Sequence, residues 1–387
     1  MENRKYTLYQ LAVYFLKLGT WGFGGPVALV GYMHRDLVES KQWLTEDEYK
    51  EGLALAQLAP GPLAAQLGIY IGFVHYGLLG ATLIGLAFVL PSFIMVLLLG
   101  MAYRLYSGLS WMRDVFYGVG AGVIGIIAIS AYKLTLKSVG KLNLASVKQN
   151  WMLWLFYSIA IIITVITQQE QILLFIGCGL LYMAVKAPPA WLRKPSTLPV
   201  LLLAGTGFWT FSKSTLWQIG LFFLKAGTFV FGSGLAIVPF LHAGVIQDYH
   251  WLTENQFVDA VAVAMITPGP VVITVGFVGY LVNGFPGAAV AALATFLPCF
   301  LFTVILAPYF KKIAKNTSIK AFVDGITAAV IGALVGSVFI IASRSIVDVP
   351  TALIALGGML LLTFVKKIQE PHVILAAAIL GVILKAI

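Results

Sequence analysis

Long runs of apolar residues alternate with short polar or basic segments along the whole chain. The runs lack the strict apolar-polar alternation of strands in an outer-membrane barrel, so they predict helices. Crossing the hydrocarbon core of a bilayer takes about 20 apolar residues, which is close to the length of most runs. They predict six spans in each half, near 7–33, 52–76, 79–103, 112–132, 150–167 and 170–187, and near 215–241, 256–282, 285–309, 321–343, 350–366 and 371–386. A further short run near 197–212 lies between the halves and is the thirteenth predicted span.

Composition places these helices in a membrane. Of the 387 residues, 60% are hydrophobic and 10% are charged, whereas a soluble domain is about 45–50% apolar and about 25% charged. A soluble enzyme and a disulfide scaffold are therefore excluded. The net charge of +10 fits a membrane protein whose cytoplasmic loops collect lysine and arginine, and no arginine-rich arm or zinc-spaced cluster indicates a nucleic-acid partner. We predict an all-α integral membrane protein whose main partner is the lipid bilayer.

An internal repeat with a spacing of 208 residues divides the chain. Residues 15–70 and 223–278 are identical at 20 of 56 aligned positions, and the identities cluster in the segments FLKxGT, FG, WLTE and PGP, which recur in the same order. One structural unit is therefore used twice. Repeats with broken helices are typical of secondary transporters, whose substrate site lies near the midplane between them.

Lysine-rich loops predict that the two halves cross the membrane in opposite directions. Four lysines between 133 and 148 follow the fourth span of the first half, whereas four lysines between 311 and 320 follow the third span of the second half. If both loops are cytoplasmic, the halves are inverted-topology repeats. The extra span near 197–212 then makes the number of crossings before the second half odd, which reverses the direction of that half. Spans one and two of each half could instead be re-entrant hairpins.

The predicted organisation is thus about 13 transmembrane helices, with the amino terminus in the cytoplasm and the carboxy terminus outside. The predicted domains are a first transporter repeat at 1–190, a linker with the extra span at 191–213, and a second transporter repeat at 214–387.

Two lysines at equivalent positions of the repeat are candidates for anion binding. Lys17 lies roughly ten residues, or about 15 Å, into its predicted span, and Lys225 lies equally deep in the other half. A lysine near the bilayer centre costs about 2.5–3.5 kcal/mol on insertion scales. Snorkelling or pairing with an acid is the structural alternative, but the repetition of a costly residue favours a shared anion site.

Glycine and proline residues that interrupt a helix follow each of these lysines. A broken membrane helix exposes unpaired N–H groups at the positive end of its second part, and these attract anions. Such a break is tolerated only beside a cavity or other protein. Polar residues near the second pair of breaks are further candidate donors, although a threonine can also bond to its own helix. The predicted substrate-binding residues are Lys17, Gly24, Gly25, Pro26, Gln57, Pro60, Gly61, Pro62, Gln66, Lys225, Gly232, Ser233, Gly234, Thr267, Pro268, Gly269, Pro270 and Thr274.

Four further titratable residues recur in pairs and are candidates for coupling or gating. His34 and His242 follow the first span of each half, and Glu51 and Asp259 lie in the first turns of the next helix. First-turn acids also suit the helix dipole, so a structural role is the alternative. The TxxE and TxxQ segments that begin at residues 45 and 253 fit a capping box at the start of the same helices. No metal-spaced cluster or nucleotide motif is apparent in the sequence, so we expect no metal and no cofactor.

Together the motifs resemble the chromate ion transporter family in its long, two-domain form. The resemblance rests on the FGGP segment at 23–26, the LAPGP segment at 58–62 and the TPGP segment at 267–270. It implies a non-enzymatic efflux transporter for chromate in the cytoplasmic (inner) membrane that confers chromate resistance, with sulfate as a competing look-alike. The second half carries GSG at 232–234 where the first has GGP, so the two half-sites are not identical.

Several alternatives stay open at this stage. A sulfate or related oxyanion importer or exchanger fits the same residues, since sulfate is also a tetrahedral dianion. An intramembrane hydrolase has only Ser233 and His242 in its favour, and a spacing of nine positions does not suit a catalytic pair on neighbouring helices. A homodimer is compatible with the sequence.

Overall fold

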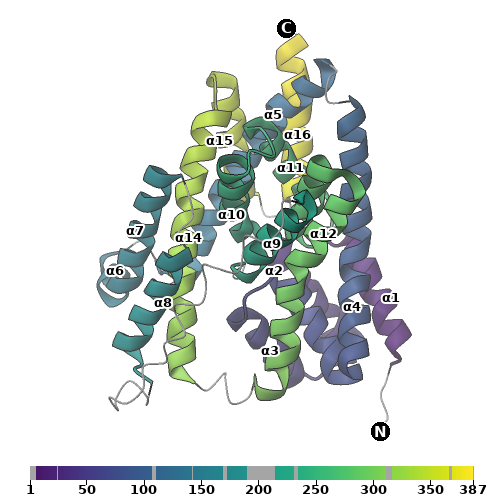
Figure 1. The fold of residues 1–387 in the computed structure, drawn as a ribbon, viewed down its shortest axis with the longest axis vertical. Coiled ribbons are helices and arrows are strands. Elements are labelled where there is room, and N and C mark those ends of the chain that lie inside the picture. The colour runs from purple at the N-terminus through teal and green to yellow at the C-terminus, as the bar shows by residue number, and fades with distance from the viewer. Residues whose placement is uncertain are drawn as a thin grey trace.

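The computed structural model describes residues 6–23, 25–106, 110–141, 143–168, 172–189, 214–230, 234–310, 316–365 and 368–386. Over these residues it consists of helices joined by turns, with no strand, so the all-α prediction is confirmed (Figure 1). The first half contains α1 (Leu8–Trp21), α2 (Gly25–Met33), η1 (His34–Ser40), α3 (Glu46–Leu58), α4 (Leu63–Tyr106), α5 (Ser110–Ser138), α6 (Leu144–Gln149), α7 (Trp151–Thr167) and α8 (Ile172–Lys186). The second half contains α9 (Thr215–Thr228), η3 (Gly234–Ile237), α10 (Val238–His242), η4 (Ala243–Asp248), α11 (Glu254–Ile266), η5 (Val271–Ile273), α12 (Thr274–Leu306), η6 (Ala307–Tyr309), α14 (Thr317–Ser345), α15 (Val349–Phe364) and α16 (Glu370–Ala386).

Four helical stretches of the described chain are long and apolar enough to cross a membrane. They are Leu63–Tyr106, Trp111–Ser138, Val271–Tyr309 and Thr317–Ser345. The apolar helices α7, α8 and α15 and the segment Gly234–Asp248 are shorter. The predicted span near 197–212 lies outside the described residues, and the count of 13 stays a prediction.

Sharp glycine turns bend α4 and α12 at equivalent positions. Gly77 has φ 63° and Gly284 has φ 58°, a left-handed conformation that glycine adopts without steric cost. The turn brings the two arms of α4 into contact, because a Cβ atom added to Gly72 would lie 2.5 Å from the carbonyl oxygen of Gly80. The first arm of α4 folds back along α3, because Glu51 of α3 hydrogen-bonds with Tyr70 of α4 and a Cβ atom on Gly52 would clash with the Tyr70 ring. These two helices therefore form a hairpin rather than one continuous crossing, and only the second arm of α4 forms a long helix.

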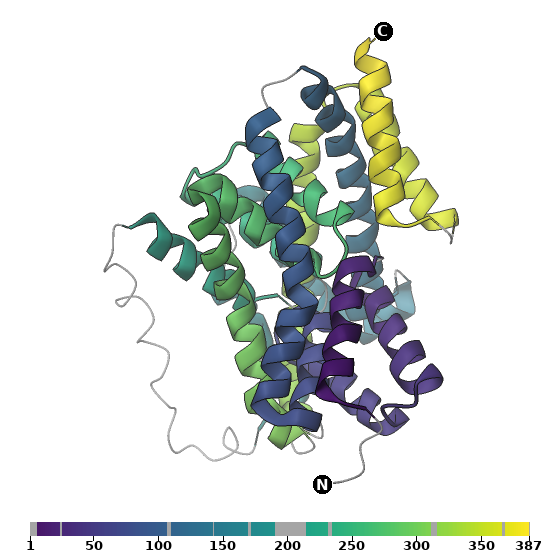
Figure 2. The ribbon, with the colours of Figure 1, turned by 90° about the vertical axis from the view of Figure 1, so that its right-hand side faces the viewer.

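The two halves exchange their last two helices. In the first half α7 and α8 pack against α14 of the second half, while α15 and α16 of the second half pack against α5 of the first. Figure 1 shows α7 and α8 beside α14, and Figure 2 shows α16 beside α5. The duplicated units are thus interleaved into one helical body.

Capping boxes begin α3 and α11, as the sequence predicts. The hydroxyl oxygen of Thr45 accepts a hydrogen bond from the N–H of Glu48, whose carboxylate accepts one in return from the N–H of Thr45. Thr253 and Gln256 form the same pair at α11. Both helices therefore start at a residue fixed by local chemistry.

Removing either cap is expected to weaken the fold slightly. Thr45→Ala or Thr253→Ala leaves orphan N–H groups at a helix start and costs about 1 kcal/mol, which corresponds to a fall of about 1–2 °C in the thermal midpoint of a chain of this size. Circular dichroism melting in detergent measures this. Thr363→Ala is the matched control, because that hydroxyl is exposed and bonds only to its own helix. An equal fall for all three variants would contradict the capping role.

Candidate functional site

The proline-glycine-proline turns of the two halves are tied to each other's first helix. The N–H of Gly61 donates to the carbonyl oxygen of Val230 at 2.5 Å, just beyond the end of α9. The N–H of Gly269 donates to the carbonyl oxygen of Gly22 at 2.9 Å, just beyond the end of α1. Both turn glycines have positive φ, 143° and 93°, where a side chain would be strained. The helix breaks therefore meet across the boundary between the repeats.

Equivalent side chains on the long helices support these turns. The Ser92 hydroxyl donates to the carbonyl oxygen of Pro268 at 2.8 Å. At the corresponding place on α12, the buried Cys299 packs against the other turn, because a Cβ atom on Gly61 would lie 3.0 Å from the Cβ of Cys299. Each turn is thus held by the long helix of the opposite half.

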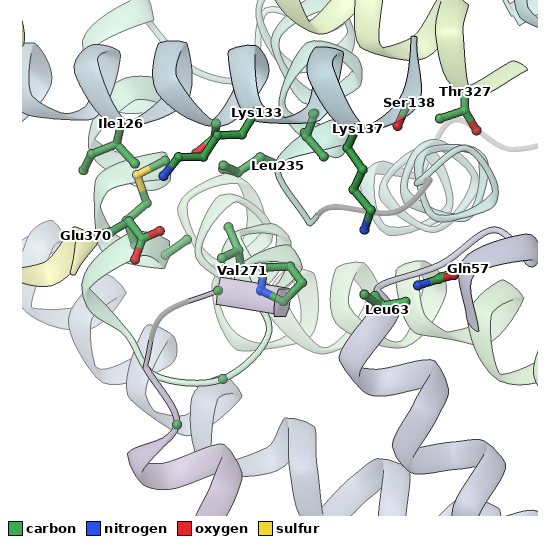
Figure 3. Close-up of a pocket in the computed structure, with 18 of the residues that line it drawn as sticks. Gln57, Leu63, Ile126, Lys133, Lys137, Ser138, Leu235, Val271, Thr327 and Glu370 are labelled. Atoms are coloured by element: carbon green, nitrogen blue, oxygen red, sulfur yellow. The ribbon is translucent and has the colours of Figure 1, made fainter. Parts of the chain in front are cut away.

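A cavity of about 710 Å³ lies beside the breaks and is lined by both halves (Figure 3). Repeat-equivalent residues face it from α3 and α11, namely Gln57 and Met265, and so do Leu63 and Val271 on the helices that follow. The cavity is therefore built where corresponding elements of the two units face each other. Its volume is far above the roughly 30 Å³ that a water molecule occupies in the liquid, so a hydrated anion has room to enter.

Charged side chains give this cavity its chemical character. Lys133 and Lys137 come from the last turns of α5, and Lys320 comes from the first turn of α14. Asp324 and Glu370 are the two carboxylates among the lining residues. Figure 3 shows the amines of Lys133 and Lys137 extending from one helix into the cavity, the first toward Glu370 and the second toward Gln57. Three cations against two anions favour a negatively charged guest.

Five of the predicted binding residues line the cavity: Gly25, Pro26, Gln57, Thr267 and Gly269. Gly25 is the first residue of α2 and has φ 71°. The start of α2 therefore reaches the cavity. Pro26 has no N–H, so the other N–H groups of the first turn carry the positive end of the helix dipole there. The described residues Pro60, Gly61, Pro62, Pro268 and Pro270 form the adjoining turns, and Gly234 begins η3. Gly24, Gly232 and Ser233 lie outside the described residues.

The two deep lysines of the sequence prediction do not line this cavity. Lys17 lies on an exposed face of α1, and Lys225 lies on an exposed face of α9. Lys225 is close enough to Asp248 for their charges to interact. A role for either lysine in binding stays a prediction that requires another conformation or another site.

The polar residues near the breaks satisfy local carbonyl groups. Gln66 is fully buried and donates from Nε2 to the carbonyl oxygen of Pro60 at 2.8 Å. Thr267 and Thr274 donate their hydroxyl hydrogens to Val263 and Val271 of their own segments, at 2.6 and 2.7 Å. Of these three, only Thr267 lines the cavity.

The paired histidines form equivalent bridges to the helix that follows. Nε2 of His34 lies 2.9 Å from Oε2 of Glu46, and Nε2 of His242 lies 3.0 Å from Oε2 of Glu254. The hydrogen bond to His34 lowers the pKa of the Glu46 carboxyl below its usual value. These bridges fix the entry to α3 and α11, and the bond that His242 makes gives no support to a hydrolase.

The paired acids lie away from the cavity. Glu51 is half-buried and hydrogen-bonds with Tyr70. Asp259 is 6% exposed and accepts a hydrogen bond from the hydroxyl of Tyr103 at 2.7 Å. Within the described ranges, no group of three His, Cys, Asp or Glu residues is placed to hold a metal ion.

Sequence reasoning treated the cavity lysines as markers of orientation and missed them as site residues. The available signal was the four-residue spacing of Lys133 and Lys137, which puts both amines on one face of a helix end. Glu370 gave no such signal, because a first-turn acid is explained by the helix dipole alone.

A helical membrane protein with a charged cavity between two repeats, beside broken helices, has the build of a membrane transporter. The chain belongs to the chromate transporter family, whose profile matches it twice, over residues 9–183 and 217–382. It is 63% identical to the chromate transport protein of Cupriavidus metallidurans over 98% of this chain and 93% of that protein. It is 58% identical to the probable chromate transport protein of Synechococcus elongatus, over 98% and 96% of the two chains, and 29% identical to the chromate transport protein of Pseudomonas aeruginosa, over 96% and 91%. No solved structure matches the chain.

Proposed function

We propose that this chain is a secondary active transporter that exports chromate across the cytoplasmic membrane by alternating access and so confers chromate resistance. The observation that carries the proposal is the cavity between the repeats, which is lined by Lys133, Lys137 and Lys320 and by the start of α2. Chromate is a tetrahedral dianion. Lysine amines and unpaired backbone N–H groups supply charge and hydrogen bonds for such an ion without a metal.

Inverted topology is part of the same proposal. It is supported by the positions of α5 and α14, which are equivalent in the repeat. Lys137 near the end of α5 and Lys320 near the start of α14 line one cavity, so the two helices run in opposite directions there. In Figures 1 and 2 α16 ends at the top, whereas α1 begins in the lower part of the view. An amino terminus in the cytoplasm, a carboxy terminus outside and 13 spans in two inverted repeats would follow from cytoplasmic lysine-rich loops.

The membrane potential favours the proposed direction of transport. Each charge moved across 100 mV is worth about 2.3 kcal/mol, so export of a dianion from an inside-negative cell gains about 4.6 kcal/mol. Proton coupling or anion exchange would add to this. Import or exchange of sulfate through the same cavity is the alternative. Chromate and sulfate are both tetrahedral dianions, and lysine side chains recognise the charge of an anion more readily than they distinguish these two shapes.

Transport assays in everted membrane vesicles test the proposal. Export from the cell appears there as uptake, so vesicles containing the protein are expected to accumulate labelled chromate in a saturable way, with sulfate as a weaker competitor. Vesicles without the protein are the control. Accumulation only in right-side-out vesicles, or only of sulfate, would support the alternative. Collapsing the proton gradient with an ionophore separates proton-coupled export from export driven by potential alone.

The proposed function includes a domain organisation and an oligomeric state. The chain would work as a first repeat at 1–190, a linker at 191–213 and a second repeat at 214–387, all embedded in the lipid bilayer. A homodimer would be compatible with this arrangement, because each chain carries both repeats and its own cavity.

A further inference from the structure

We propose that the carboxylate of Glu370 competes with the transported anion for the start of α2. It lies there when the cavity is empty, and its return after substrate binding favours release of the anion. The inference rests on the proposed function, since it assumes that the cavity is the substrate site. It adds a specific residue that controls how tightly the anion is held.

The position of Glu370 places a carboxylate beside the first helix break. Glu370 is the first residue of α16 and belongs to the second half, yet its side chain reaches the first helix break of the first half. One carboxylate oxygen lies 3.9 Å from the place where a Cβ atom on Gly25 would stand. A negative group is therefore already seated beside the start of α2, where we expect the substrate oxyanion to accept hydrogen bonds.

The carboxylate of Glu370 also differs in its partners from the other carboxylate of the cavity. Across the described residues the structure gives Glu370 neither a hydrogen bond nor an ion pair, although it is half-buried in a cavity that contains lysines. Asp324, the other lining carboxylate, differs because its charge interacts with that of Lys320 one turn earlier. A carboxylate that has no partner among the described residues can move within the cavity.

Electrostatic interactions within the cavity also involve Glu370. Figure 3 shows Lys133 extending toward the side of the cavity where Glu370 lies. The same amine would attract either the carboxylate or an incoming dianion, and the two negative charges would repel each other inside a poorly screened cavity. Substrate binding then requires Glu370 to withdraw, and its return favours release. The structural alternative is that Glu370 only stabilises the start of α16 through the helix dipole.

Kinetics of chromate uptake in everted vesicles separate these readings. Glu370→Gln keeps the shape of the side chain and removes its charge, so the KM for chromate is expected to fall about tenfold, and the maximal rate is expected to fall because release becomes slower. Glu370→Asp keeps the charge but retracts it by one methylene, and an intermediate KM is expected. Asp47→Asn, an exposed acid in the first turn of α3, is the matched control and is expected to keep the parent KM.

A KM for Glu370→Gln that is unchanged or raised, in protein that accumulates normally, would overturn the inference. If Glu370→Gln fails to accumulate, Glu370→Asp decides the matter, because an unchanged KM in that variant contradicts competition at the α2 start. The double variant Lys133→Met, Lys137→Met tests the proposed site itself. If the lysine variant raises the KM and the Glu370 variants leave it unchanged, only the competition by Glu370 is rejected. If the lysine variant leaves the KM unchanged, both the proposed substrate site and the competition are rejected.

Discussion

Chromate uptake is expected to be lost when Lys133 and Lys137 are both replaced by methionine. These amines extend into the cavity from one face of α5 and supply two of its three cations. A hydrogen bond to a charged group contributes roughly 1.5–3 kcal/mol, so each replacement should weaken chromate binding about 10- to 100-fold. Initial rates of labelled chromate uptake in everted vesicles, across a range of concentrations, measure this loss.

The comparison variants separate binding from membrane insertion. Lys141→Met, Lys148→Met removes two charges from the next stretch of the same lysine-rich segment without touching the cavity lining, so it controls for effects on orientation. It should transport normally. Lys17→Ala, Lys225→Ala tests the prediction made from the repeat alone. Loss of uptake in that variant, with uptake intact in the cavity variant, would move the substrate site away from the cavity.

Replacing Gly72 and Gly279 together with alanine is expected to prevent the protein from accumulating in the membrane. A Cβ atom on Gly72 meets the backbone of Gly80, and one on Gly279 meets the backbone of Gly287, so neither clash is relieved by a side-chain rotation. Overpacking costs about 1–3 kcal/mol at each site, and distant sites add. The sum is a large share of the roughly 5–15 kcal/mol that holds a folded protein together.

Gly177→Ala is the matched control for the double variant Gly72→Ala, Gly279→Ala. This glycine lies in α8, and a Cβ atom there has no neighbour within 4 Å. Alanine is favoured over glycine inside a helix by about 1 kcal/mol, so this variant should accumulate as well as the parent or better. Fluorescence-detected size exclusion of tagged protein measures both. Equal yields for the Gly72→Ala, Gly279→Ala variant and the control would contradict the close contact between the two arms of α4 and of α12.

Much of the fold was readable because the determining signals are local. Continuous apolar runs required helices, the capping boxes at Thr45 and Thr253 marked where two of them start, and the repeat predicted that whatever one half builds the other half builds again. The proline-glycine-proline motifs predicted breaks, and the breaks lie beside the cavity.

The site was only partly readable because it depends on contacts between distant segments. Depth along a predicted span favoured Lys17 and Lys225, but depth says nothing about which face of a helix turns inward. Lys133 and Lys320 are 187 residues apart in sequence and line one cavity because α5 and α14 pack against each other. The hydrogen bond from Gly61 to Val230 is equally invisible from either segment alone.

The exchange of helices between the halves also constrains how the protein is made. During synthesis α7 and α8 are made long before α14, the helix on which they pack, because 159 residues separate the end of α8 from the end of α14. At a translation rate of about 5–20 residues per second, the wait lasts roughly 10 to 30 s. Throughout that interval the faces of α7 and α8 that pack on α14 in the finished protein lack their partner helix.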